Sequence, residues 1–318
     1  TFWTIFLSNY CESSGSQAYR FPSMPVFQLN FVSHDCLCCP LDQLALRQLG
    51  NALCCDNGHS FDIAKQGYVN LLSAQDKRSH DPGDGKDMVA ARREFLNNGH
   101  YQPIAEHLAE LVGSLCNENP IIADAGCGEG YYLEQLSRKL KSDHRCTPAM
   151  IGFDISKWAT KAATRRMMAT WLVASNRNIP LARNSVNCLL SLFGFPVYPS
   201  FAKILKPGGT LLMVDVGLQH LIELRETIYP SVRHSDSTVE KDALSAGFSV
   251  GETSTVRFQT APLKQLEINQ LLSMTPHLYR ASREGLERVA KLDHLPVTVE
   301  VSFRCLRTPT EDWASTNS

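Results

Sequence analysis

A short apolar run that leads into closely spaced glycines limits most strongly how this chain can fold. Residues 121–125 are Ile-Ile-Ala-Asp-Ala, and Gly126, Gly128 and Gly130 follow at alternate positions. Leucines three and four residues apart begin at Leu133, which is the spacing of one helix face. A buried strand, a glycine-rich loop and a helix in this order start an α/β sheet that binds a ligand at the helix N-terminus.

The chain after residue 103 alternates between strand-like and helix-like patterns. Strands are expected at seven places, namely 120–125, 150–153, 171–174, 186–193, 210–216, 248–258 and 297–305. Alternation of this kind predicts a parallel sheet covered by helices. We therefore expect a Rossmann-like α/β domain over residues 104–306, with a mostly parallel seven-stranded sheet, and a tail at 307–318.

Two acidic residues indicate which ligand the glycine loop holds. Asp124 lies two residues before the first glycine, and Asp154 ends the next expected strand. A carboxylate at the first position can help hold an ammonium group, and one at the second can accept both hydroxyls of a ribose. The spacing Gly-x-Gly-x-Gly also differs from the Gly-x-Gly-x-x-Gly of nicotinamide dehydrogenases. We therefore expect S-adenosylmethionine at Asp124, Gly126, Gly128, Gly130 and Asp154.

A cluster of cysteines precedes this domain. Cys55 and His59 are separated by three residues, which is a good half of a zinc site. The other pair of ligands has two interpretations, Cys36 with Cys39 or Cys39 with Asp42. We expect a structural zinc ion held by Cys39, Asp42, Cys55 and His59, with Cys36 as the alternative fourth ligand. The simpler alternative is that several of these cysteines are free buried thiols.

The cysteine cluster and the turn residues divide the chain before the α/β domain. Residues 1–34 are expected to be a disordered extension, and residues 35–72 a zinc-binding module that is too small to bury a core of its own. A polar connector with a helical stretch should follow over residues 73–103.

Charge and hydropathy restrict the partners of the chain. The net charge is −1, so a nucleic acid would have to be met by a local basic face. Between Phe61 and His100 six basic residues are balanced by six acidic ones, and this count identifies no such face. No apolar run approaches the ~18 residues of a membrane span. The odd number of cysteines, eleven, favours a reducing compartment, and we expect a cytoplasmic protein without a membrane partner.

Beyond these patterns, the chain resembles the bacterial large-subunit (23S) rRNA guanine-N1 methyltransferases, which carry a zinc module before a class I S-adenosylmethionine-dependent domain. The resemblance runs from about residue 39 to about residue 305, and its most specific stretch is 58–72. The segments that carry it are 55–72, 77–84, 91–96, 99–103, 126–132, 220–224 and 274–276.

The resemblance implies a function and further site residues. It implies methyl transfer from S-adenosylmethionine to N1 of a guanine in a stem-loop of large-subunit rRNA, with zinc in a structural role. Tyr101, the backbone at Gly128 and Glu129, and His220 would contact the cofactor. From the residues alone, we would predict His220 to be a surface histidine at the start of a helix.

Two local features bear on that resemblance. Cys39 and Asp42 fall where the family has two cysteines, so an aspartate replaces one thiolate. The end of the fourth strand, residues 191–196, lacks the Asn/Asp-Pro-Pro-aromatic motif of exocyclic amino-group methylases, which fits a ring nitrogen as the target. Aromatic stacking by Phe193, Phe195 or Tyr198 is one hypothesis, and a core or lid role for each is the other.

Other functions share parts of this sequence pattern. The runner-up is a class I methyltransferase that acts on a small molecule or a protein, because a fold does not fix a function. A zinc-module binding protein with a degenerate methyltransferase domain is disfavoured by the intact loop. The sequence identifies no catalytic base, and it is compatible with a homodimer formed through the zinc module or a domain edge.

Overall fold

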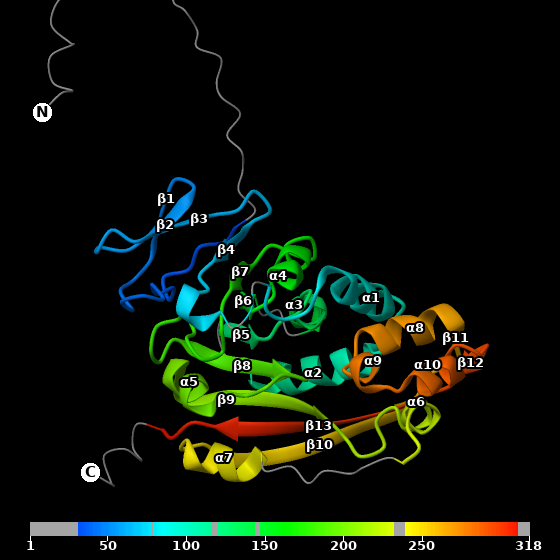
Figure 1. The fold of residues 1–318 in the computed structure, drawn as a ribbon. Coiled ribbons are helices and arrows are strands. Elements are labelled where there is room, and N and C mark those ends of the chain that lie inside the picture. The colour runs from blue at the N-terminus through cyan, green and yellow to red at the C-terminus, as the bar shows by residue number, and fades with distance from the viewer. Residues whose placement is uncertain are drawn as a thin grey trace, which may run out of the picture.

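An eight-stranded sheet forms the centre of the molecule (Figure 1). The computed structural model describes residues 31–77, 79, 81–115, 120–143, 147–231 and 239–310. From edge to edge the strands are β10 (Ser249–Gln259), β13 (Thr298–Arg307), β9 (Leu205–Val216), β8 (Val186–Leu192), β5 (Ile121–Ala125), β6 (Ala149–Asp154), β7 (Thr170–Val173) and β4 (Tyr68–Asn70). β13 is antiparallel to both neighbours, and the other pairs are parallel. The predicted α/β fold class with a mostly parallel sheet is confirmed.

Helices cover both faces of this sheet because its inner strands are apolar on both faces. Alternate residues of β5 show the two layers, since Ile122 and Ala123 belong to separate buried clusters. The Ile122 layer is filled by α2 (Gln102–Leu115), α3 (Tyr131–Asp143) and α4 (Lys157–Ala163), and the Ala123 layer by α5 (Tyr198–Ile204) and α7 (Val239–Ser245). Leu133, Leu136 and Leu140 of α3 are fully buried, as their spacing predicts.

The cysteine-rich segment forms a small sheet beside the β4 end of the large one (Figure 1). Its antiparallel strands are β1 (Arg47–Leu49), β2 (Ala52–Cys54) and β3 (Ser60–Asp62). The next strand, β4, leaves this small sheet and pairs with β7, with Tyr68 opposite Trp171. The large sheet therefore has the seven predicted strands and an eighth from the segment that we assigned to the zinc module.

The two ends of the chain lie partly outside the described residues. The predicted extension falls outside them up to residue 30, whereas Phe31 is buried in the same cluster of core residues as Ala123. The predicted tail begins at Arg307, the last residue of β13, and Thr308 is still buried. Residues 311–318 are outside the described part.

The connector between the small sheet and the α/β domain packs against the end of β6. It contains the 3-10 helix η1 (Ala74–Asp76) and helix α1 (Lys86–Asn97). The Trp158 indole N–H donates to Asp81 Oδ2 at 2.6 Å, and the Ser156 hydroxyl donates to the Asp84 carbonyl at 2.6 Å. A Cβ on Gly83 would lie 2.9 Å from Ile155 Cγ2, so the connector backbone touches the edge at which parallel strands end.

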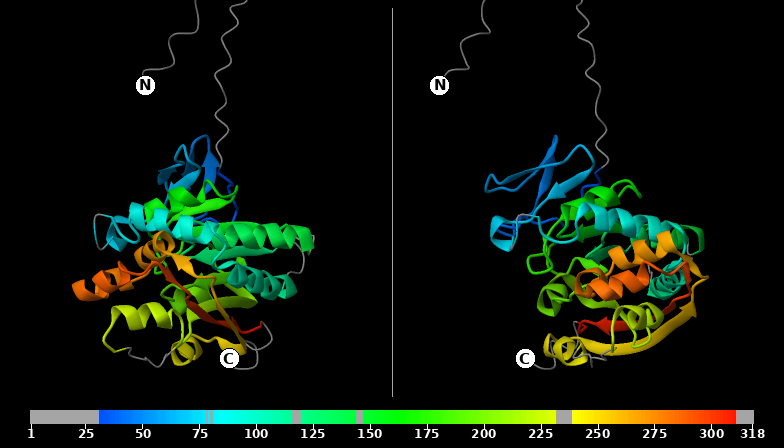
Figure 2. Two further views of the ribbon diagram at one scale, coloured as in Figure 1. Left: turned by 90° about the vertical axis from the view of Figure 1, so that its right-hand side faces the viewer. Right: turned by 45° about the vertical axis from the view of Figure 1, so that its right-hand side comes forward.

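A helical insertion covers the same edge between β10 and β13. It holds β11 (Leu263–Lys264), α8 (Gln265–Ser273), α9 (His277–Arg280), α10 (Arg283–Val289) and β12 (His294–Leu295). Figure 2 shows α8 beside α1, and α10 packs on α6 (Ile222–Ile228). His100 bonds Glu267 at 3.0 Å across the α1–α8 contact. In the described part of the chain, no helix is long and apolar enough to cross a membrane.

Gly152 in β6 allows the large indole of Trp171 to pack against the sheet. A Cβ at this position would lie 2.2 Å from Trp171 Cζ3, and Trp171 is fully buried. We expect Gly152→Ala to lower the free energy of unfolding by about 1–3 kcal/mol, the usual cost of overpacking a core. Urea unfolding followed by circular dichroism measures this change. Gly85→Ala, where nothing lies within 4 Å, is the control, and equal losses in both variants would contradict the explanation.

Candidate functional site

The glycine loop joins β5 to α3 and is held by the end of β6. The amides of Gly126 and Cys127 donate to the Phe153 carbonyl at 2.8 and 3.1 Å. Gly126 and Gly128 have φ of +83° and +55°, which residues with a Cβ rarely adopt. The loop can therefore turn back on itself and present its backbone to a ligand at the start of α3.

Asp154 holds this loop from the next strand. Its Oδ2 accepts from the Gly128 amide at 2.9 Å, and its Oδ1 accepts from the Ser156 amide at 2.7 Å. Burial raises the pKa of Asp154, and these two amides partly oppose that effect. Each carboxylate oxygen keeps a further lone pair, so Asp154 can position the loop and still accept a ribose hydroxyl.

Asp124 is the group in this region that most clearly lacks a partner. It is 2% exposed, and no group in the described part of the structure donates to its Oδ1. Burial, and then the charge of Asp154, raise the pKa of Asp124 to about 8. A buried carboxylate without a donor costs free energy. The ammonium group of S-adenosylmethionine is a donor that would satisfy it, so the residues fit this cofactor.

Glu129 turns its side chain away from the ligand side of the loop. Its carboxylate is 1% exposed and accepts two hydrogen bonds from Arg166, at 2.7 and 2.8 Å. Burial raises the pKa of Glu129, and the charge of Arg166 opposes the shift. This leaves the backbone of Glu129 for the cofactor, as the resemblance implies. No local sequence pattern pointed to Arg166, which lies 37 residues further along the chain.

Tyr101 and His220 form a second buried pair. Tyr101 is 3% exposed and His220 is 9% exposed, and the tyrosine hydroxyl lies 3.5 Å from His220 Nε2. Burial lowers the pKa of His220 to about 4. The Glu300 amide donates to His220 Nδ1 at 3.3 Å, so the proton of the neutral ring is on Nε2. The prediction from the residues alone that His220 is a surface histidine is wrong.

Tyr132 connects the Tyr101–His220 pair to the glycine loop, and it was not among the site residues predicted from the sequence. It is the second residue of α3, and its buried hydroxyl lacks a partner among the described residues. Burial, and then the nearby Tyr101, raise the pKa of Tyr132 well above its usual value. Its ring also lies 6.1 Å from that of Phe193, which follows β8. The position directly after the glycine loop was the signal that could have identified it.

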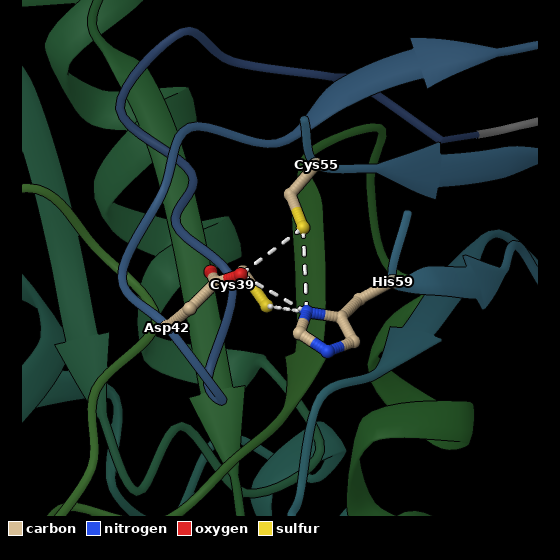
Figure 3. A group of neighbouring side chains, drawn as sticks. All are labelled: Cys39, Asp42, Cys55 and His59. Atoms are coloured by element: carbon tan, nitrogen blue, oxygen red, sulfur yellow. Dashed lines mark hydrogen bonds and ion pairs between the residues drawn. The ribbon is translucent and has the colours of Figure 1, made fainter. Parts of the chain in front are cut away.

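The four predicted zinc ligands converge on one point (Figure 3). His59 Nδ1 lies 3.4 Å from the Sγ atoms of both Cys39 and Cys55 and 3.0 Å from Asp42 Oδ2. The four ligand atoms all lie within 4.8 Å of one another. Ligands around a tetrahedral zinc ion are roughly 3.4–3.8 Å apart, so the group needs only a small adjustment to hold one.

Two short turns bring these ligands together. The Leu44 amide donates to Asp42 Oδ1 at 3.0 Å, which leaves Oδ2 toward the thiols. In the second turn, the Gly58 amide donates to the Cys55 carbonyl at 2.9 Å. Burial would raise the pKa of Asp42, but its hydrogen bonds outweigh burial and hold that pKa below its usual range. Asp42 would therefore be a charged ligand.

Cys36, the alternative fourth ligand, lies outside this group. Its thiol is buried near the Ser185 side chain, and burial raises its pKa to about 11. Cys38 points toward the Cys36 carbonyl at 3.9 Å. The structure thus brings Asp42 to the cluster rather than Cys36. Zinc would be bound here by Cys39, Asp42, Cys55 and His59, and would fix the two turns without taking part in chemistry.

Comparison with known proteins agrees with this organisation. The N-terminal zinc-ribbon model described as "RlmA, N-terminal" matches residues 37–80, and a methyltransferase-domain model matches residues 122–209. In fold and cofactor loop, the protein is a class I S-adenosylmethionine-dependent methyltransferase with an N-terminal zinc ribbon. Among solved structures, the phosphoethanolamine N-methyltransferase 2 of Haemonchus contortus aligns with 61% of this chain and 50% of its own, at 15% identity and a TM-score of 0.37.

Curated relatives identify the family within that class. The 23S rRNA (guanine(748)-N(1))-methyltransferase of Streptomyces fradiae is 31% identical over 276 residues, which cover 85% of this chain and 95% of the relative. A protein of Micromonospora griseorubida, provisionally named 23S rRNA (guanine-N(1)-)-methyltransferase, is 33% identical over 80% of this chain and 90% of its own. The chain belongs to the 23S rRNA (guanine-N1) methyltransferase family.

The Asp42 carboxylate is expected to be a zinc ligand. Asp42→Ala should lower the zinc affinity about tenfold or more, because ligand number sets the affinity of such a site. Competition with a chromophoric chelator measures the affinity. Asp56→Ala is the matched control, because this nearby aspartate pairs with Arg47 at the surface. Equal zinc affinity in the wild type and the Asp42 variant would exclude Asp42 as a ligand.

The raised pKa of Asp124, about 8, predicts a pH dependence. A carboxyl group whose pKa is higher in the folded state than its ordinary 3.8 stabilises the fold fully below that value, and the contribution is lost as the pH rises through 8. Without S-adenosylmethionine, Asp124→Asn should therefore melt at a higher temperature than the wild type above pH 8.

Thermal melting between about pH 5 and pH 9 tests this expectation, since the shift is lost over that range. Added S-adenosylmethionine should flatten the pH dependence of the wild type more than that of the variant, because the ammonium group stabilises the charged carboxylate. Asp293→Asn, an exposed position, is the control. Parallel melting curves for the wild type and Asp124→Asn would show that Asp124 is not the titrating group.

Proposed function

We propose that this chain transfers the methyl group of S-adenosylmethionine to N1 of a guanine in 23S rRNA. The observation that carries the proposal is the combination of a zinc cluster and an intact glycine loop in one chain that is 31% identical to a 23S rRNA (guanine(748)-N(1))-methyltransferase over 85% of its length. The α/β domain alone would also fit the alternative, a methyltransferase for a small molecule or a protein, so the zinc ribbon is the part of the chain that favours this function.

The chemistry of the target restricts the RNA. N1 lies on the Watson–Crick edge of guanine, so the base must be unpaired or turned out of its helix before the methyl group can reach it. A guanine in a stem-loop meets this requirement. We therefore propose a stem-loop of the rRNA as the substrate element.

The residues of the site would bind, orient and exclude water. S-adenosylmethionine supplies a methyl group on a sulfonium that is open to in-line displacement. Asp124 would accept the ammonium group, and Asp154 would accept a ribose hydroxyl while it holds the Gly128 amide. Tyr101 and His220 close the buried side of the site. Such alignment accounts for much of the catalysis in a displacement of this type.

His220 would position Tyr101 and would not abstract the proton of guanine N1. Guanine N1 carries a proton at neutral pH, so the proton must leave during the transfer. The Nδ1 of His220 accepts from the Glu300 amide, and its protonated Nε2 faces Tyr101. Neither nitrogen is free to take the N1 proton. We assign His220 a role in holding Tyr101 against the cofactor.

Location and assembly complete the proposal. No disulfide joins cysteines in the described part of the chain, which suits the reducing conditions of the cytoplasm. The finer proposal is a cytoplasmic enzyme that forms a homodimer through the zinc module or an edge of the sheet. Sedimentation velocity over a concentration series tests the dimer.

Methyl transfer to RNA is the direct test of the function. The full chain is incubated with labelled S-adenosylmethionine and 23S rRNA transcribed in vitro, and the digested nucleosides are separated by mass spectrometry. We expect labelled 1-methylguanosine. Asp124→Asn should lower kcat/KM about 100-fold, the cost of a misplaced reactant, and Asp293→Asn should not. Intact binding of S-adenosylmethionine without label in RNA would favour the alternative, a small-molecule or protein substrate.

A further inference from the structure

Phe195 is the most exposed large apolar side chain among the described residues, at 91%. It belongs to the aromatic loop, residues 193–196, which follows the carboxyl end of β8. A single exposed apolar residue needs no explanation by itself. This one, however, lies at the edge of the sheet where such folds bind their ligands. Its neighbour Phe193 is 40% exposed and lies against Tyr132 of the cofactor site.

The aromatic loop is held in place from one side. The Asn176 side-chain amide donates to the Phe195 carbonyl at 3.2 Å. Asn176 belongs to the linking turn, residues 175–178, which follows β7 and is closed by a bridge between Ser175 and Asn178. Phe195 is therefore presented to solvent by a fixed backbone.

The metal loop, residues 39–44, holds the linking turn in place. The Asn178 side chain donates to the Pro40 carbonyl at 3.0 Å, and the Gln43 amide donates to Asn178 Oδ1 at 3.5 Å. Cys39 and Asp42 of this loop are two of the four residues that would hold zinc. A continuous chain of hydrogen bonds thus runs from the zinc cluster to the aromatic loop.

Gln43 is the central residue of this chain of contacts. Its φ is +64°, which is uncommon for a residue other than glycine. In this conformation its side chain also donates to the Cys39 carbonyl at 3.3 Å and accepts from Lys203 Nζ at 3.1 Å. These bonds compensate the unfavourable backbone geometry, and they keep the metal loop against the α/β domain.

The surface over these three segments combines the groups that bind single-stranded RNA. Phe195 offers an aromatic face, Arg177 of the linking turn is an exposed cation, and Leu41 of the metal loop is 58% exposed. The Asp42 carboxylate is turned into the zinc cluster. An aromatic ring and a cation on two connected loops suit an unpaired base and its phosphate.

We propose that the aromatic loop, the linking turn and the metal loop form one RNA-docking surface. Phe195 stacks on an unpaired base of the rRNA loop that holds the target guanine, and Arg177 contacts a backbone phosphate. Gln43 and Asn178 keep the surface in one piece. This inference rests on the proposed function, since it names where the same substrate binds.

Stacking by Phe195 is tested by RNA binding to the full chain. The probe is fluorescent 23S rRNA transcribed in vitro, and the dissociation constant is measured by titration. Phe195→Ala should raise the Kd about tenfold, the usual effect of losing one base stack, whereas Phe195→Trp should restore it. The affinity for S-adenosylmethionine should stay unchanged in both. Leu244→Ala, on α7 and 56% exposed, is the matched control and should bind like the wild type.

The roles of Arg177 and Gln43 are tested separately. Arg177→Gln should reduce the slope of log Kd against log salt by about one, as expected for one lost phosphate contact. Arg307→Gln, exposed at the end of β13, should not. Gln43→Asn keeps a residue that tolerates the left-handed conformation but shortens the side chain. It should weaken RNA binding and leave the zinc content at the wild-type level.

The outcomes distinguish this surface from the proposed function. If the wild type methylates 23S rRNA and Phe195→Ala binds it with unchanged Kd and KM, the docking surface is wrong and the function stands. If Phe195→Ala instead changes the sedimentation coefficient and not the RNA affinity, the surface is an interface between copies of the chain. If the wild type puts no label into RNA, the function is overturned and the surface with it.

Discussion

The carboxylate of Asp154 holds together the segments on which the site depends. One oxygen accepts the Gly128 amide of the glycine loop, and the other accepts the Ser156 amide that starts α4. The Ser156 hydroxyl continues this set of bonds to the Asp84 carbonyl in the connector. The side chains of Asp154 and Ser156 thus fix the cofactor loop, the helix after β6 and the connector from the zinc ribbon. The partly buried position of Asp154 is tolerated because both oxygens receive amide donors.

A second buried group secures the loop from the opposite side. Arg166 is 7% exposed and pairs with Glu129 at 2.6 Å and with Glu134 at 3.1 Å. It also donates to Asn97 at the end of α1 at 2.8 Å and lies over the Tyr131 ring. Removal of the guanidinium would leave the buried Glu129 carboxylate with only the more distant Arg93, at 3.9 Å, which is costlier than the pair itself is stabilising. The network therefore fixes the loop more than it adds stability.

Features that are local in sequence were predictable, and features that depend on distant contacts were not. The strand, glycine loop and helix at 121–143 follow from spacing alone, because each residue's role is set by near neighbours. The pairing of β4 with β7 joins residues about one hundred positions apart, Tyr68 and Trp171, and no periodicity encodes it. The burial of His220 depends on Tyr101 and on β13 in the same way. The family resemblance identified His220 only because it carries information on those contacts.

The pairing of β4 also explains how the zinc site can use an aspartate. Leu37 bridges Leu181 before the first ligand, and β4 pairs with β7 after the last one. Both ends of the cysteine-rich segment are therefore attached to the α/β domain independently of the metal. An isolated zinc module must obtain its folding free energy from the metal, whereas here the sheet supplies much of it. A weaker fourth ligand would be sufficient under these conditions, because the metal needs only to fix the two turns that carry its ligands.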